Sequence, residues 1–305
     1  MSNLKCMVIS VFFRLISGLV RRLPCAARLQ TFLVRASSRL SRCRLDFTFK
    51  TRISGLRWSA LAFPDLLTRH MLFSGIYQDD VLFALRTFAV PGSTVFDVGG
   101  HHGLMAIVAA LSVGPAGRVI SFEPNPAARR FFEKNISLND VKNIRIESIG
   151  LSDEQGEVSF YVQRGTASWN SSLFQEFISP GYETEKMTIQ TQTMDQFVTE
   201  TGIVPNVVKI DIEGSEFLAL KGARESIRRH HPVLIMEFNP DAAEAAGTTI
   251  AEIVDFLREE SYRLVVFKKD RRRRYTRTSW EDFSENKHCR DDLANVVCLP
   301  RGADP

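Results

Sequence analysis

A glycine-rich run joins a short β-branched segment to an apolar, helix-like segment. The run is Asp97-Val98-Gly99-Gly100-His101-His102-Gly103, and it begins inside a strand expected over residues 94–98. Glycines let the backbone approach a ligand closely, and a helix that starts directly afterwards presents unpaired N–H groups. The run therefore predicts a ligand-binding turn, with a tight turn that binds nothing as the alternative.

An acidic residue closes the next expected strand. Glu123 follows the strand 118–122 and stands twenty residues after Gly103, where a carboxylate can accept hydrogen bonds from both hydroxyls of a ribose. A dinucleotide site would require glycine at the position of Asp97. The Asp97 carboxylate would crowd a pyrophosphate, but it suits a cofactor with an ammonium group and a sulfonium. We therefore predict S-adenosylmethionine as the cofactor, ahead of NAD.

Two further strands end in carboxylates. Asp211 and Glu213 close the strand expected over residues 207–212, and Glu237 closes the one over 233–238. The carboxyl ends of parallel strands share the sheet edge at which ligands collect. A protonated alcohol is a weak nucleophile, so we consider Glu213, Glu237 and His102 as general bases for it. The alternatives stay open: Asp211 and Glu213 as helix caps, and Glu237 as a partner of an arginine-rich segment.

Histidine and cysteine give no sign of a metal site. His101-His102 follows the carboxyl end of one expected strand, whereas His230-His231 precedes another, so the pairs belong at opposite sheet edges. The five cysteines are odd in number and contain no C-x-x-C pair, which fits neither a disulfide framework nor a zinc site. We expect no metal, and a reducing compartment.

These residues require a parallel sheet, and the pattern after Thr94 supplies one. Short β-branched runs alternate with helical segments, as in βαβ units. An interruption over residues 157–191 predicts an inserted hairpin and loop of the kind that forms substrate sites. The expected fold is α/β and Rossmann-like, with helices on both faces of a mostly parallel seven-stranded sheet. Its strands are 94–98, 118–122, 144–148, 207–212, 233–238, 263–267 and 295–299, and its helices 104–113, 126–138, 194–201, 216–229 and 249–260.

The first 45 residues differ in composition from the rest. They carry nine Lys or Arg and no acidic residue, while the whole chain has a net charge of +4. Residues 4–22 predict an apolar helix with a thin polar stripe, in which Arg14 disfavours a membrane span. Residues 28–42 predict a basic amphipathic helix. We expect a helical arm over residues 1–45 that lies on anionic membrane surfaces, with packing on the catalytic domain or in a dimer as the alternative.

The remaining chain divides into a helical lead-in over residues 46–93 and a catalytic domain over 94–305. Nucleic acid is not an expected partner, because stacking aromatics and a recognisable nucleic-acid module are missing. The basic run Arg271–Arg274 is interpreted as a solvated loop that could add to the basic surface. We expect a cytoplasmic protein that associates with the membrane peripherally.

From about Gly75 to Pro300 the chain resembles the FkbM family of methyltransferases. The resemblance rests on residues 95–103, 121–125, 152–156 and 209–216, the last being Lys-Ile-Asp-Ile-Glu-Gly-Ser-Glu. His101 and Gly100 stand where similar proteins usually have Asn and Ala. The resemblance implies the class I methyltransferase fold, with cofactor contacts from Asp97, Gly99, Gly100, His101, Gly103, Glu123, Pro124, Ser152 and Asp211.

The resemblance also implies a reaction. Similar proteins transfer the methyl group of S-adenosylmethionine to hydroxyl groups of sugars, glycolipids or secondary metabolites, with Glu213 facing the acceptor. Two other functions are weighed against this one: a catalytically silent Rossmann module that acts as a membrane adaptor, and an NAD-dependent oxidoreductase.

Overall fold

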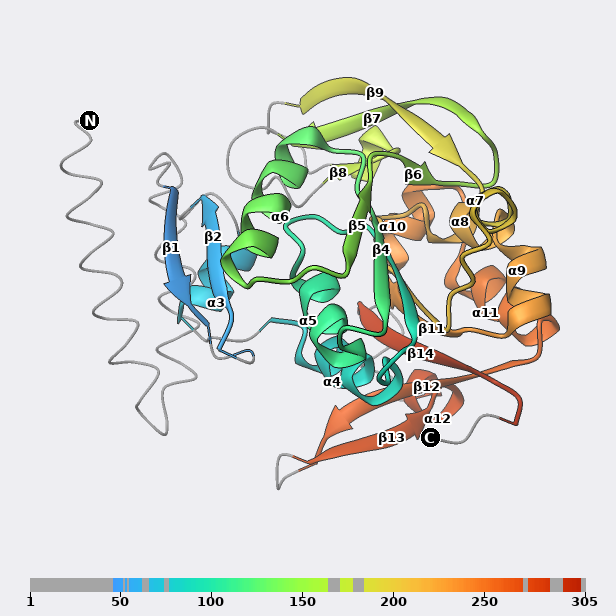
Figure 1. The fold of residues 1–305 in the computed structure, drawn as a ribbon. Helices are drawn as coiled ribbons and strands as arrows, with labels where there is room; N and C mark the ends of the chain where they lie inside the picture. Colours follow the sequence, from blue (N-terminus) through green and yellow to red (C-terminus); the bar gives the residue numbers. More distant parts are fainter. Residues whose placement is uncertain are drawn as a thin grey trace.

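The computed structural model describes residues 46–51, 53, 55–61, 66–73, 77–163, 171–177, 184–270, 274–285 and 293–302. Within them the chain forms a central sheet with helices on both faces and a smaller sheet beside it (Figure 1). The expected arm over residues 1–45 lies outside the described residues. None of the helices in the described part of the chain is both long and apolar enough to cross a membrane.

The central sheet is mixed. The five strands β11, β10, β3, β4 and β5 run parallel to one another, and β14, β12 and β13 continue the sheet with antiparallel pairs. All seven expected strands are present, which confirms the α/β Rossmann-like fold. In spatial order the strands are β13 (Tyr275–Ser279), β12 (Tyr262–Lys269), β14 (Ala294–Pro300), β11 (Val233–Phe238), β10 (Val207–Ile210), β3 (Thr94–Val98), β4 (Arg118–Phe122) and β5 (Ile144–Glu147).

The eighth strand, β13, was not expected from the sequence. Its residues alternate little in polarity, and among the described strands it pairs with β12 alone, at the sheet edge. Tyr275 at its start stacks on Phe83 of the helix α4 (Asp79–Phe88), with ring centroids 4.1 Å apart. The strand is therefore stabilised by a tertiary contact, which its local sequence pattern does not reveal. The basic run that precedes β13 lies mostly outside the described residues.

Alternating side chains give the sheet two buried faces. Val95, Val119 and Val207 pack with α4 and with the helix α5 (Leu104–Val113). The next residues along the same strands, Phe96 and Val208 among them, face the other core. That core is covered by α7 (Met194–Thr201), α8 (Glu216–Lys221), α9 (Arg224–His230) and α11 (Ile250–Glu259), while α6 (Pro126–Leu138) covers the β4 end of the first face.

One expected helix is broken in two. The helix predicted over residues 216–229 is α8 followed by α9, with a break at Gly222 and Ala223. A Cβ atom on Gly222 would come 2.0 Å from the backbone oxygen of Ser152, so the chain is packed too closely there for a side chain. The short helices α10 (Pro240–Ala245) and α12 (Trp280–Glu285) and the 3₁₀ turn η2 (Gln175–Phe177) were not expected either.

The predicted insertion is a small sheet of its own. Strands β7 (Gly156–Gln163) and β9 (Thr184–Gln192) form an antiparallel hairpin, and β6 (Gly150–Leu151) and β8 (Ser171–Ser172) pair with its outer sides. In Figure 1 this sheet lies across the top of the molecule. The hairpin that the sequence predicts over residues 157–191 is therefore confirmed.

The lead-in is helical only in its second part. Strands β1 (Asp46–Lys50) and β2 (Arg57–Leu61) form a hairpin before α3 (Leu66–Phe73) and α4, so the expectation of an all-helical segment over residues 46–93 was wrong at its start. The hairpin is held by α6, because Asn135 Oδ1 accepts from Ser59 N at 2.7 Å and Asn139 Oδ1 accepts from Arg57 N at 2.8 Å. These partners lie far away in sequence, so local pattern could not reveal them.

Candidate active site

A cavity of about 1100 Å³, including its open mouth, lies between the carboxyl ends of the parallel strands and the small sheet. The loop after β3 and the residues after β4 and β10 form its polar floor. Leu151, Phe160 and Ile189 give it an apolar wall from the small sheet. Tyr77 and Gln78, directly before α4, close a further side. The ends of three of the strands that carry predicted site residues therefore meet at one cavity, and Glu237, on the fourth, is not among the residues that line it.

The glycine-rich loop is packed directly on the end of β10. Gly99 has a φ of 84°, and a Cβ atom there would come 2.0 Å from the backbone oxygen of Asp211. His101 also has a positive φ, of 47°, which histidine tolerates better than most residues. Gly99, Gly100 and His101 line the cavity, as predicted for the loop, whereas Gly103 packs on Phe132 beneath it.

Glu123 holds the loop from the β4 side. Its carboxylate accepts from His101 N at 2.6 Å and from Asn125 N at 2.8 Å, and the side chain is buried. Burial raises the pKa of Glu123, and these two backbone donors oppose the rise. Each carboxylate oxygen retains a further lone pair that can accept from a ligand. Both Glu123 and Pro124 line the cavity at the predicted place.

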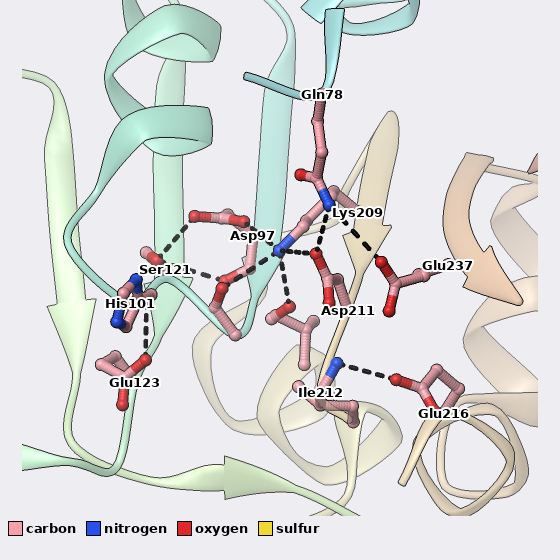
Figure 2. Close-up of polar contacts among 12 residues, drawn as sticks. Gln78, Asp97, His101, Ser121, Glu123, Lys209, Asp211, Ile212, Glu216 and Glu237 are labelled. Carbon is pink, nitrogen blue, oxygen red and sulfur yellow. Dashed lines mark hydrogen bonds and ion pairs between the residues drawn. The ribbon is translucent and has the colours of Figure 1, made fainter. Parts of the chain in front are cut away.

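The β10 side contains a buried cation that the sequence analysis did not single out. Lys209 Nζ lies 3.5 Å from Asp97 Oδ1 and 3.6 Å from Asp211 Oδ2, and it donates to the backbone oxygen of Gly99 at 3.0 Å (Figure 2). Asp97 is 1% exposed and also accepts from Ser121 Oγ at 3.0 Å. Asp97 thus supports the floor from below, while Asp211 lines the cavity.

Three carboxylates gather where β10 and β11 end. One oxygen each of Asp211, Glu213 and Glu237 lies within 4.8 Å of the other two. Gln78 Nε2 donates to Asp211 Oδ2 at 3.4 Å and to Glu237 Oε1 at 3.5 Å (Figure 2). We call Asp211, Glu213 and Glu237 the acidic cluster. The absence of a metal site stays a prediction, since divalent cations also use sets of carboxylate oxygens.

The acidic cluster holds protons tightly. Burial, and then the charges of Asp211 and Glu213, raise the pKa of Glu237 to about 10. Burial, and then Asp211 and Glu216, raise the pKa of Glu213 well above its ordinary value. Like charges in a poorly solvated place disfavour simultaneous ionisation. The cluster therefore favours a proton or a cationic ligand.

Glu216 fixes the loop that carries Glu213. Its carboxylate accepts from Ile212 N at 2.8 Å and from Gly214 N at 2.9 Å, and burial raises its pKa to about 7. Ser172 of the small sheet donates to the backbone oxygen of Glu213 at 2.7 Å. The carboxylate that binds the backbone before α8 is thus Glu216, which leaves Asp211 and Glu213 facing the cavity.

Three further predicted site residues are buried: His102, Ser152 and Glu237. His102 lines the cavity but is 2% exposed, with its ring stacked on His101 at a centroid distance of 3.8 Å. Ser152 is buried, donates to Asp153 Oδ1 at 3.1 Å and packs against Gly222, so the neighbouring Leu151 faces the cavity in its place. Glu237 reaches the cluster from below and is 8% exposed.

The cavity fits S-adenosylmethionine. Glu123 and Asp211 follow strands on either side of β3, about 10 Å apart at ordinary strand spacing, so one carboxylate can take ribose hydroxyls and the other an ammonium group. The apolar wall suits an adenine ring. Ser215 Oγ, buried and without a hydrogen-bond partner among the described residues, offers one more polar contact in the cavity.

Comparison with known families agrees with this geometry. The family model described as "Methyltransferase FkbM domain" matches residues 97–264, which is more than half of the chain. The match contains the glycine-rich loop, Glu123 and the acidic cluster. It does not include Gln78, which comes from the lead-in.

Individual relatives are more distant. "Hexuronic acid methyltransferase AglP" of Haloferax volcanii is 29% identical over 160 residues, which are 52% of this chain and 61% of that protein. "Methyltransferase 1" of Beauveria bassiana is 25% identical over 148 residues, which are 43% of this chain and 58% of that protein. The chain thus spans about 60% of the length of these curated relatives. A solved structure of methyltransferase FkbM from Methylobacillus flagellatus is 14% identical, with 87% of this chain and 58% of that chain covered and a TM-score of 0.41.

Proposed function

Because the chain belongs to the FkbM family of S-adenosylmethionine-dependent methyltransferases, we propose that it methylates a hydroxyl group of a sugar-containing acceptor in the cavity above β3 and β10. The observation that carries the proposal is the order of groups along the floor. Glu123, the glycine-rich loop and Asp211 form a cofactor-sized track, and Glu213 follows at its end. An acceptor beside Glu213 would lie next to the cofactor's reactive end.

Each residue of the track would contact a different part of the cofactor. Glu123 would accept from the ribose hydroxyls, and Asp211 would pair with the ammonium group. The backbone of Gly99 and Gly100 would allow close approach of the ligand. S-adenosylmethionine, when bound, supplies the methyl group, and the protein contributes mainly by holding the acceptor in line with it.

Glu213 is the general base in this proposal. It lines the cavity and is partly exposed, whereas Glu237 and His102 are buried. Its raised pKa makes the ionised carboxylate a stronger base toward an alcohol, and a cationic cofactor nearby would favour that ionised form. The Glu213 carboxylate would take the hydroxyl proton during attack, a contribution of about 10²- to 10⁴-fold in rate.

The relative from Haloferax volcanii bears a name that refers to a hexuronic acid, which is a sugar with both hydroxyl and carboxyl groups. The acidic cluster would repel a sugar carboxylate placed beside Glu213, because like charges at short distance are costly. This repulsion supports a hydroxyl as the methylated group.

Labelled methyl transfer tests the proposal. The protein is incubated with methyl-labelled S-adenosylmethionine and a cell extract, and label is followed into sugar, glycolipid and small-molecule fractions. We expect label in a sugar fraction that survives mild alkali, since a methyl ether is stable there and a methyl ester releases methanol. Alkali-labile label would replace hydroxyl methylation by carboxyl methylation. Tight binding of S-adenosylhomocysteine without any transfer would indicate a silent module.

We also propose that residues 1–45 attach the enzyme reversibly to anionic membranes. Nine Lys or Arg and no acidic residue occur there, and each basic side chain near an anionic surface contributes about 1 kcal/mol. The full chain should sediment with vesicles that contain anionic lipid, less so as salt rises, and little with neutral vesicles. Replacing Arg35, Arg39 and Arg42 by Gln should weaken attachment. A full chain that ignores anionic vesicles at low salt would refute the attachment.

A further inference from the structure

We propose that Lys209 is a positioning residue for the amino-acid end of S-adenosylmethionine, which it orients through Asp211 and the glycine-rich loop. The inference rests on the proposed cofactor site, and it assigns a role to a residue that the sequence analysis passed over. Lys209 sits in the central strand β10, whose four residues are all buried.

Strand geometry brings the interacting groups together. Lys209 is paired in register with Asp97 on the neighbouring parallel strand β3, so both side chains emerge at the same level. Asp211 follows two residues later, and a period of two places it on the same face of the sheet. That face is the one covered by α4 and α5. The three charges therefore converge because of sheet register.

The ammonium group is surrounded by oxygen atoms. Lys209 Nζ donates to the backbone oxygens of Gly99 at 3.0 Å and of Val98 at 3.4 Å, in addition to its ion pairs with the two aspartates (Figure 2). The two backbone oxygens accept hydrogen bonds from Nζ, and one oxygen of each aspartate lies 3.5 to 3.6 Å from it. Through these contacts one side chain links the end of β3, the start of the loop and the first residue after β10.

Lys209 keeps its charge although it is 4% exposed. Burial alone would lower its pKa, but Asp211 and Asp97 outweigh burial and raise the pKa above its ordinary value. If the charge were removed, Asp97 and Asp211 would face each other without the cation between them. The loop carbonyls would lose their donor as well, and Asp211 would no longer be held in one place.

The influence of Lys209 should be confined to one end of the ligand. Glu123 on the β4 side is held by the backbone N–H groups of His101 and Asn125. Neither of these two hydrogen bonds involves Lys209. The adenosine end of the cofactor therefore depends on a separate set of hydrogen bonds. A role limited to one end distinguishes positioning from general support of the fold, which would affect both ends alike.

Two ligands that differ only at this end provide the test. S-Adenosylhomocysteine has both an adenosine and an amino-acid end, whereas 5′-methylthioadenosine lacks the amino acid. Dissociation constants for both are measured with the full chain by calorimetry, with competition for the weaker ligand. For Lys209→Met we expect S-adenosylhomocysteine to bind about 10-fold or more weakly, the usual loss for a disturbed charged hydrogen bond. Binding of 5′-methylthioadenosine should change by less than about 3-fold.

The matched control is Lys142→Met, at an exposed lysine whose side chain pairs with Asp140 at the surface. It should leave both constants unchanged. Because Lys209→Met removes the cation between Asp97, which is buried, and Asp211, the double variant Lys209→Met/Asp97→Asn is measured too. It removes one of these two carboxylates, so it should fold more stably than the single variant and retain the selective loss.

The outcomes distinguish the role of Lys209 from the existence of the cofactor site. Equal loss for both ligands in the folded double variant, or no loss for either, would overturn the role of Lys209 while leaving the cofactor site intact. Failure of the unsubstituted protein to bind S-adenosylhomocysteine would instead overturn the proposed function itself.

Discussion

On the β4 side of the glycine-rich loop, the carboxylate of Glu123 meets two backbone N–H groups at 2.6 and 2.8 Å. On the β10 side, Asp211, Glu213 and Glu237 face one another, and the nitrogen donors that reach them, Lys209 and Gln78, stand 3.4 to 3.6 Å away. The Glu123 carboxylate is thus stabilised by backbone donors close to it. The β10 side holds more carboxyl groups than nearby donors can stabilise as anions, so the pKa values of Glu213 and Glu237 are raised.

This difference suggests that the β4 side binds the cofactor, whereas the acidic cluster takes part in the reaction. A carboxylate with short, local hydrogen bonds is preorganised, so it can hold a neutral sugar ring without rearrangement. A cluster with raised pKa values is poised to exchange protons or to accept a positive charge. We therefore expect substitutions on the β4 side to change cofactor affinity, and substitutions in the acidic cluster to change turnover and pH dependence.

The largest effect should come from Glu213→Gln. The amide keeps the size of the side chain but cannot take a proton, so turnover should fall by about 10²- to 10⁴-fold. Binding of S-adenosylhomocysteine should change little, because Asp211 supplies the charged contact to the cofactor. Rates with labelled cofactor and an active extract fraction, together with calorimetry, measure the two quantities. Unchanged turnover would show that Glu213 is not the general base and would leave Glu237 or His102 as the candidates. It would also weaken the contrast between the two sides of the cavity.

Glu123→Ala should have the next largest effect, on affinity. The substitution removes the expected ribose acceptor and the anchor of the loop at His101, which should weaken S-adenosylhomocysteine binding by about 10- to 100-fold. Calorimetry on the folded variant measures the change. Glu133→Ala, at an exposed glutamate of α6, is the control and should bind normally. An unchanged constant for Glu123→Ala would remove this residue from the site.

Sequence predicted what depends on local pattern. The parallel strands, their turns and the acidic residues that follow them arise from short runs of residues, and Asn125 caps α6 by accepting from Ala127 N at 2.9 Å. Glu123 has its partners within 22 residues, so its place could be inferred from the strand-turn-helix pattern. The position of the β4 residues at the cavity could therefore be predicted from the sequence, whereas their contact with the cofactor stays a prediction.

The β10 half depends on distant partners. Gln78 reaches Asp211 and Glu237 across 133 and 159 residues, from a lead-in that the family match does not include. The sequence around Lys209 does indicate a buried ion pair. Lys209 is flanked by apolar residues in a short strand, and a lysine is almost never buried without a partner. Its position between Val208 and Ile210 therefore indicates a carboxylate on a neighbouring strand, which is Asp97 of β3.

The last effect concerns stability and its dependence on pH, not ligand binding or turnover. The pKa of Glu237 is about 10 in the folded protein, against an ordinary value of 4.5. Below pH 4.5 the residue is protonated in both the folded and the unfolded chain. Between these two values the folded chain retains a proton that the unfolded chain has released, so the contribution of Glu237 to the free energy of unfolding declines as pH rises.

Glu237→Gln removes this dependence, because an amide does not ionise in this range and has nearly the same shape. The ligand-free variant should therefore unfold at a temperature similar to that of the unsubstituted protein at pH 5, and at a higher one at pH 9, because the difference in free energy of unfolding grows by up to about 1.4 kcal/mol per pH unit between the two. Glu225→Gln, at an exposed residue of α9, should show no such growth with pH. Scanning calorimetry at several pH values measures all three proteins. If the difference between Glu237→Gln and the unsubstituted protein stayed constant from pH 5 to pH 9, the cluster would not hold its extra proton, and the two sides of the cavity would be electrostatically alike.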